Sequence, residues 1–215
     1  LGCGKAVSNA ITWFFDHVEE GIILEDDCLP HVSFFSWCSD LLHHYRNESR
    51  IFTISGVNFQ DGIRRGEGSY YFSAIQHIWG WATWKRAWQT YDFETKNLES
   101  FISKKKIEKY FNDQKLQQFW IRNFSSVHSR QLDTWDHQWT FNVWDHGGVS
   151  IIPNTNLVSN IGFGDNATHT HGDSVFANSD TFTADIQLRH PDEIRIDHEA
   201  DLYFYKEVDR FFVHE

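Results

Sequence analysis

The feature that most constrains this chain is a short apolar run that ends in three consecutive acidic residues. Ile22-Ile23-Leu24 follows Gly21 and leads directly into Glu25-Asp26-Asp27. A continuous apolar run of this kind is typical of a strand in a sheet that is covered on both faces. Three adjacent carboxylates repel one another, so they are tolerated where water solvates them or where a cation neutralises them. The sequence therefore predicts a buried strand whose carboxyl end is open to solvent.

Helical and strand patterns alternate around this run. Apolar residues recur at helical spacing over residues 5–18, and Pro30 is well placed to open a second helix that runs to about Tyr45. Further strands are expected at 51–55, 69–74 and 149–152, and further helices at 85–91, 98–124 and 134–146. This alternation is typical of an α/β fold, with a mixed sheet flanked by helices.

Composition limits the classes of function. The chain has 215 residues, of which 40% are hydrophobic, so one packed domain is expected. A net charge of -11 argues against a nucleic-acid binder, but not against a phosphorylated small ligand bound through a divalent cation. The three cysteines form no CxxC pair, which favours a reducing compartment, and no apolar run is long enough to span a bilayer.

The acidic run has two interpretations. In open α/β sheets, ligands gather beyond the carboxyl ends of strands, and carboxylates suit Mn²⁺ or Mg²⁺ with further ligands from a substrate's phosphates. Alternatively, the run is a solvated turn in which Asp27 caps the next helix. Its position after an apolar strand and before Pro30 favours a binding site.

Five stretches carry a resemblance to a known family, namely residues 21–30, 54–59, 79–84, 135–139 and 151–162. They resemble GT-A-fold nucleotide-diphospho-sugar glycosyltransferases. The acidic triplet is similar to that of the N-acetylglucosaminyltransferase I family, and the whole pattern is closer to bacterial hemolysin-like sugar transferases. The likeness covers about residues 1–172, which we expect to form a partial GT-A-like domain, with residues 173–215 as a C-terminal extension that packs on it.

The resemblance implies a function and a role for each acid. It implies metal-dependent transfer of a sugar from a nucleotide-diphosphate donor, a UDP-sugar foremost, to a glycan or lipid-linked acceptor in polysaccharide biosynthesis. Asp27 would bind the Mn²⁺ or Mg²⁺ that bridges the donor's phosphates, Asp26 would lie near the ribose or sugar, and Glu25 would support the site. Such an enzyme is expected in the cytoplasm, including the surface of the inner membrane.

A second carboxylate is needed to take the acceptor's proton. The resemblance assigns this role to Asp136, as the base of an inverting displacement. The residues alone favour a structural interpretation, in which Asp136 caps or begins a helix. Asp133 and Asp145 are rival candidates, and Asp145 lies near a helix end, which is a poor electrostatic position for a purely structural acid.

Two other motifs are candidates for ligand contacts. His169 and His171 lie in a polar loop, and His171 is expected to contribute a further metal ligand, although 13 histidines make chance pairs common. Trp79-Gly80-Trp81 fits a wall of the acceptor or donor-sugar pocket, with Gly80 allowing close backbone approach. Packing of both tryptophans in the core is equally compatible with the sequence.

The chain departs from the family pattern at its start. GT-A folds place several nucleotide-binding strands before the acidic motif, whereas only one helix is predicted before it here. We therefore expect the N-terminal nucleotide-binding part to be missing and the chain to be a piece of a longer protein. Two alternative functions remain: a non-catalytic carbohydrate-binding domain, and a metal-dependent phosphate-ester hydrolase that uses the acids with His169 and His171.

Overall fold

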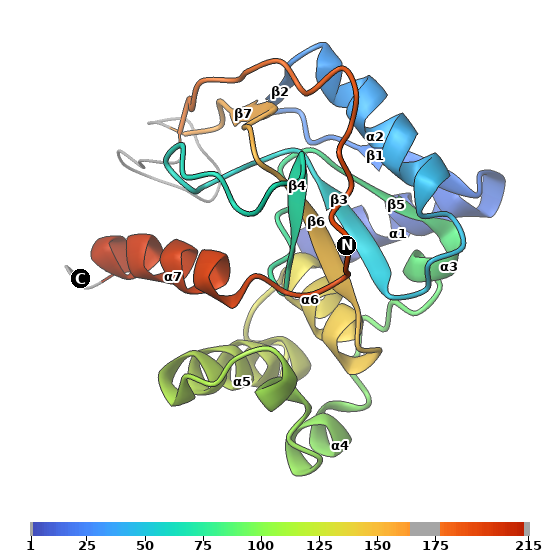
Figure 1. The fold of residues 1–215 in the computed structure, drawn as a ribbon. Helices are drawn as coiled ribbons and strands as arrows, with labels where there is room; N and C mark the ends of the chain where they lie inside the picture. Colours follow the sequence, from blue (N-terminus) through green and yellow to red (C-terminus); the bar gives the residue numbers. More distant parts are fainter. Residues whose placement is uncertain (1, 164–176, 213–215) are drawn as a thin grey trace.

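The chain is an α/β protein with a mixed sheet between helices, as the sequence predicts (Figure 1). The computed structural model describes residues 2–163 and 177–212. The main sheet has the strand order β1-β5-β3-β6-β4, in which only β3 and β6 are parallel. Its strands are β1 Glu20–Ile23, β5 Trp81–Trp84, β3 Ile51–Ser55, β6 Val149–Pro153 and β4 Tyr70–Ser73. A separate two-stranded ribbon pairs β2 Cys28–Pro30 with β7 Val158–Asn160.

One helix, α2 (Ser33–His44), covers one face of the sheet. Its apolar side buries Phe34, Trp37 and Leu41 against strand residues such as Ile54 and Ala82. Burial of such apolar side chains contributes roughly 25 cal/mol to the free energy of folding for each Å² of surface removed from water. This layer therefore holds β3, β5 and β6 together from one side.

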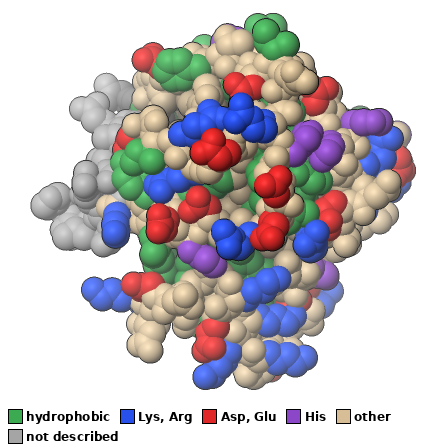
Figure 2. All heavy atoms as spheres, viewed as in Figure 1, with side chains coloured by type: hydrophobic (Ala, Val, Ile, Leu, Met, Phe, Trp, Pro, Cys, Tyr) green, Lys and Arg blue, Asp and Glu red, His purple; other side chains and the backbone are tan. Residues whose placement is uncertain are grey.

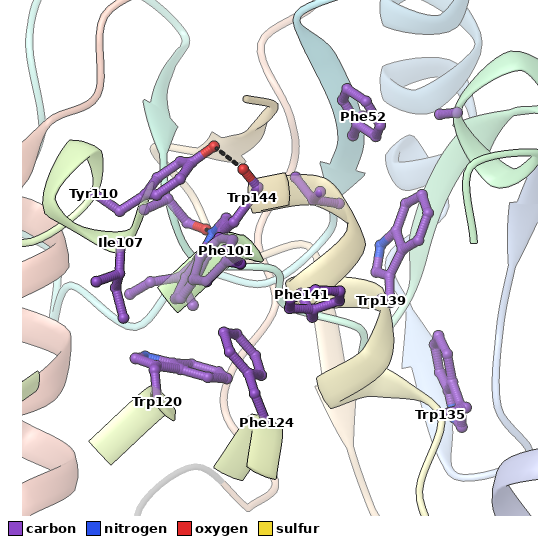
Figure 3. Close-up of a cluster of buried hydrophobic side chains, with 14 of the residues drawn as sticks. Phe52, Phe101, Ile107, Tyr110, Trp120, Phe124, Trp135, Trp139, Phe141 and Trp144 are labelled. Atoms are coloured by element: carbon purple, nitrogen blue, oxygen red, sulfur yellow. Dashed lines mark hydrogen bonds between the residues drawn. The ribbon is translucent and has the colours of Figure 1, made fainter. Parts of the chain in front are cut away.

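The opposite face carries an unusually aromatic core (Figure 3). Trp139 is fully buried in α6, lies 5.2 Å from Trp88 and 5.6 Å from Trp81 between ring centroids, and donates a hydrogen bond from Nε1 to Thr53 Oγ1. The elements on this side are α1 Cys3–His17, α3 Lys85–Trp88, α4 Leu98–Ser103, η1 Lys106–Lys109, α5 Gln114–His128 and α6 Asp136–Asp145. The high aromatic content is thus used mainly in packing.

Three sequence predictions about elements are wrong. The expected helix over 98–124 is broken into α4, η1 and α5, because Lys105 has a left-handed φ of 52° and Asp113 caps α5 through the amides of Lys115 and Leu116. Pro30 does not open a helix: it pairs with Val158 in the ribbon, and α2 begins at Ser33. The first strand is not covered on both faces, since β1 is a half-buried edge strand that pairs with β5.

The C-terminal segment contacts the main sheet and carries a helix that the sequence analysis missed, α7 (His198–Phe212). Ile196 bridges to Phe72 at the edge of β4, and the Gln60 side chain donates to the carbonyl of Ala200 at 3.1 Å. Tyr205 Oη accepts a hydrogen bond from Trp120 at 2.6 Å. Of the helices described, none combines the length and apolarity needed to cross a bilayer.

Candidate active site

The acidic residues form a turn between the edge strand β1 and the ribbon strand β2. The amide of Cys28 donates to the carbonyl of Glu25 at 3.1 Å, which closes the turn. Gly80 has a φ of 67°, and a Cβ there would lie 2.8 Å from Val158 and 3.2 Å from Leu24. Gly80 therefore permits close packing of the ribbon and the loop on the sheet, because a side chain would push them away, whereas its place in a ligand pocket stays a prediction.

The carboxylate of Glu25 lies among three other carboxylates. Burial, followed by repulsion from Asp27, Asp136 and Asp26, raises the pKa of Glu25 to about 7, and a hydrogen bond from the Trp135 side chain opposes the rise. Glu25 and Asp27 are half-buried, whereas Asp26 is exposed. The fold thus brings Asp136, distant in the chain, within electrostatic range of the predicted triplet.

Asp136 is the first residue of α6 and not its N-cap, which is Trp135. The carboxylate is half-buried and accepts a hydrogen bond from the hydroxyl of Thr134. An acid in the first turn of a helix interacts favourably with the positive end of the helix dipole. A carboxylate held in this way is available to accept a proton from a bound hydroxyl.

The two rival acids have structural partners. Asp133 accepts hydrogen bonds from the amides of Cys3 and Gly4, each at 3.0 Å, and so caps the beginning of α1. Asp145 forms an ion pair with Lys106 at 2.7 Å and accepts a further hydrogen bond from Asn97. The charges that raise the pKa of Glu25 come from Asp27, Asp136 and Asp26, and not from either rival. These contacts leave Asp136 as the acid placed beside the triplet.

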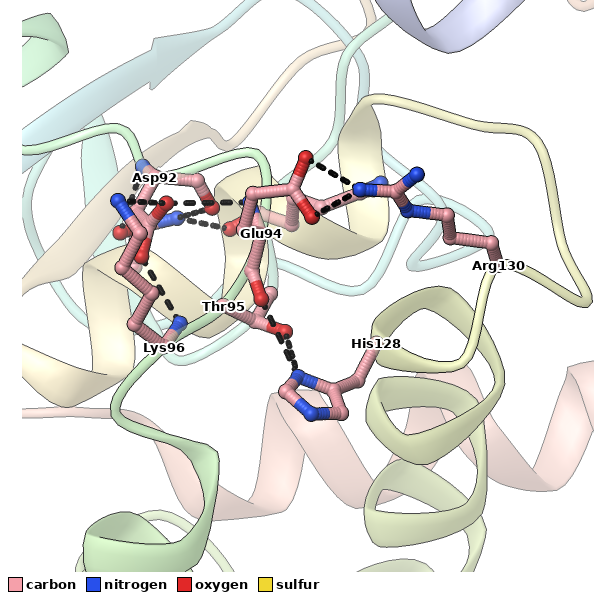
Figure 4. Close-up of polar contacts among 8 residues, drawn as sticks. Asp92, Glu94, Thr95, Lys96, His128 and Arg130 are labelled. Carbon is pink, nitrogen blue, oxygen red and sulfur yellow. Dashed lines mark hydrogen bonds and ion pairs between the residues drawn. The ribbon is translucent and has the colours of Figure 1, made fainter.

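Polar contacts fix the segment that leads to Asp136 (Figure 4). Arg130 pairs with Glu94 at 2.7 Å, and His128 Nδ1 lies 3.0 Å from the hydroxyl of Thr95. On the other side, a Cβ at Gly4 would lie 2.4 Å from the carbonyl oxygen of Thr134, so α1 abuts the segment directly. The backbone before α6 is therefore held between α1 and the 92–96 loop.

The structure separates the two tryptophans of the Trp79-Gly80-Trp81 motif. Trp81 is fully buried, with 0% exposure, and stacks on Trp135 at 5.7 Å between ring centroids. The prediction that Trp81 lines a pocket is wrong, because its strand position directs the ring into the aromatic core. Trp79 is half-buried and meets Phe59 and Phe163 edge-on, each at 5.5 Å. Trp79 is thus the one of the pair that reaches the surface.

The carboxylate oxygens at this site are of the kind that a hard divalent cation prefers as ligands. Glu25, Asp27 and Asp136 are half-buried carboxylates, and no ion pair among the described residues involves them or Asp26. Within the described ranges, no three His, Cys, Asp or Glu side chains are arranged to hold a metal by themselves. His169 and the predicted ligand His171 lie outside the described residues. An ion that takes its remaining ligands from phosphates and water suits such a site.

Two residues at this site were missed from the sequence. Trp135, which hydrogen-bonds to Glu25, was noted only as part of a motif around Asp136. Gly162 abuts the carboxylate of Asp27, and its one sequence signal is its place at the end of the stretch 151–162 that carries the resemblance. No protein-family model matches the chain, and no curated protein matches it.

A hollow of about 890 Å³ lies elsewhere, along the edge strand β4. It is bounded by residues 65–72 and 189–199 and includes none of the predicted site residues. Its charged side chains comprise three arginines together with five acids, and Figure 2 shows acidic and basic side chains interspersed over the face that carries β4. The hollow therefore presents no field of a single sign.

Proposed function

We propose that this chain is a metal-dependent, GT-A-like glycosyltransferase, which transfers a sugar from a nucleotide-diphosphate donor to an acceptor hydroxyl with inversion. The observation that carries the proposal is the placement of Asp136 beside Glu25-Asp26-Asp27. The sequence resemblance assigns a metal site to the triplet and a base to Asp136. Folding brings the two motifs together, although they are far apart in the sequence.

Each carboxylate has a distinct part in the proposed reaction. Asp27 holds a divalent cation, which when bound stabilises the leaving diphosphate as a Lewis acid. Asp136 accepts the proton of the acceptor hydroxyl while that oxygen forms a bond to the anomeric carbon of the sugar. The bond from this carbon to the phosphate oxygen breaks, and the nucleoside diphosphate leaves with the electron pair. Trp135 orients Glu25 through their hydrogen bond, and Glu25 supports the turn.

The electrostatics of the turn support this division of roles. Burial, followed by repulsion from the neighbouring carboxylates, raises the pKa of Glu25, so the cluster repels itself in the absence of a cation. A bound divalent ion reverses the local field and admits a diphosphate, even though the chain carries a net charge of -11. Binding of an anionic donor and binding of the metal are therefore expected to depend on each other.

The test is release of nucleoside diphosphate from nucleotide sugars, UDP-sugars first, in the presence of Mn²⁺. We expect turnover by the wild type that EDTA abolishes and that Asp27→Asn and Asp136→Asn each lower by about 100-fold or more. Asp16→Asn is the matched control, because Asp16 is an exposed acid on α1. Turnover unchanged in Asp27→Asn and Asp136→Asn would refute the proposal.

The two alternative functions give different results in the same preparations. A phosphate-ester hydrolase releases phosphate from simple esters and leaves the sugar nucleotides intact. A carbohydrate-binding domain binds glycans equally well with EDTA and in Asp136→Asn. Either result, without release of nucleoside diphosphate, would replace the transferase proposal.

A further inference from the structure

Gly162 directly faces the carboxylate of Asp27. A Cβ at residue 162 would lie 2.1 Å from Asp27 Oδ2 and 2.9 Å from its Cβ and Cγ, which is closer than side chains pack in proteins. The φ of Gly162 is outside the left-handed region, so its backbone conformation is open to any residue. What excludes a side chain here is the Asp27 carboxylate itself.

Backbone hydrogen bonds fix both sides of this contact. The amide of Ile161 donates to the carbonyl of Asp27 at 2.9 Å, and the amide of Gly162 donates to the side chain of Asn160 at 2.8 Å. Cys28 and Asn160 are partners in the β2–β7 ribbon. These hydrogen bonds hold the backbone at residues 161–162 against that at Asp27. Moving the two backbones apart to make room for a side chain at residue 162 would break them. The carboxylate of Asp27 is the part that must move.

The orientation of Asp27 therefore depends on the absence of a side chain at residue 162. Asp27 Oδ1 lies 3.7 Å from the thiol of Cys28, and Oδ2 occupies the space that a Cβ at residue 162 would need. We propose that Gly162 is a positioning residue, which sets the direction in which Asp27 presents its oxygens to a divalent cation. This inference rests on the proposed function, in which Asp27 is the metal ligand. Metal sites respond to such indirect contacts, since outer partners orient the ligands.

The first experiment measures Mn²⁺ affinity from the electron paramagnetic resonance signal of free Mn²⁺. We expect Gly162→Ala to raise the Kd for Mn²⁺ at least about tenfold, while the urea midpoint of the metal-free protein changes little, since the carboxylate can swing towards solvent. Ile161→Ala is the control: it removes an exposed neighbouring side chain and leaves the same backbone contacts, and should keep the Kd within about twofold. Asp27→Asn reports on the proposed function separately.

The outcomes distinguish the two claims. Weaker Mn²⁺ binding in Asp27→Asn, combined with wild-type binding in Gly162→Ala, overturns the positioning role and leaves the metal site standing. Wild-type binding in Asp27→Asn overturns the proposed function itself. Should Gly162→Ala unfold, the double variant Asp27→Gly/Gly162→Ala decides the matter by its urea midpoint. Recovery of stability in the double variant supports the contact with the carboxylate, and no recovery refutes it.

Discussion

A buried acid outside the proposed site gives the sharpest test of the electrostatics of this fold. Asp201 lies in the first turn of α7 with 2% exposure. Its carboxylate accepts hydrogen bonds from Ser73 Oγ at 2.5 Å and from the amide of Ala74 at 3.0 Å. Burial outweighs these two bonds and raises the pKa of Asp201 from 3.8 to about 7.

The sign of the effect on stability follows from the direction of the shift. Between pH 4 and pH 7 the unfolded chain has lost the proton of Asp201 while the folded protein keeps it, so stability falls as pH rises. Each pH unit in this range removes roughly 1.4 kcal/mol, and the whole window removes about 4 kcal/mol. The contribution is fully present below pH 4 and is lost by the time pH passes the folded pKa.

The perturbation is Asp201→Asn, since an amide imitates the protonated acid. Its oxygen accepts from the amide of Ala74, and its NH₂ group donates to Ser73 Oγ. We expect equal stabilities at pH 4 and a variant more stable than wild type by about 4 kcal/mol at pH 8, measured by urea denaturation. The pKa shift of Glu25 cancels in this comparison because both proteins retain it. Asp192→Asn, at an exposed acid, should show no such divergence.

Parallel pH profiles of wild type and Asp201→Asn would refute this reasoning. Such a result would mean that the pKa of Asp201 is the same in the folded and the unfolded protein. The two hydrogen bonds would then balance burial. An aspartate in the first turn would, in that case, act as an ordinary helix-stabilising acid.

Two further predictions concern residues that the structure assigns to packing and to an ion pair. Trp139→Ala should cost about 3–5 kcal/mol of unfolding free energy by urea denaturation, because it empties the middle of the aromatic core; a loss below about 1 kcal/mol would contradict that role. Asp145→Ala should cost about 2 kcal/mol by the same measurement, because it removes the carboxylate that pairs with Lys106, and should leave Mn²⁺ affinity unchanged. A weakened Mn²⁺ affinity in Asp145→Ala would show that the wrong acids have been assigned to the site.

Local patterns predicted much of the fold because they depend on short-range chemistry. The helix at α1 and the strands β3, β4 and β6 were expected within about two residues, since helical spacing and apolar runs reflect burial directly. The break between α4, η1 and α5 was not, because the left-handed Lys105 is a conformation that sequence composition does not signal. The pairing of Pro30 with Val158 depends on a distant strand. Helix α7 lies in the expected C-terminal extension, in which no helix was predicted.

The candidate site, like the fold, was predicted only in part from the sequence. The three acids at the end of a strand were found from their order in the sequence, and the nearness of Asp136 was expected from the resemblance. The burial of Trp81 and the contact of Gly162 with Asp27 depend on how the ribbon closes over the sheet. Such contacts join residues far apart in the chain. A single sequence therefore indicates the candidate carboxylates, whereas the residues that pack against them emerge from the fold.

The most direct test of the account is the position of manganese in crystals grown with Mn²⁺ and UDP. The account predicts an anomalous-scattering peak in contact with a carboxylate oxygen of Asp27, with the diphosphate on its far side and Asp136 facing the same space. A peak on other residues, or no peak while Asp27 keeps its orientation beside Gly162, would contradict the claim that this turn binds the metal.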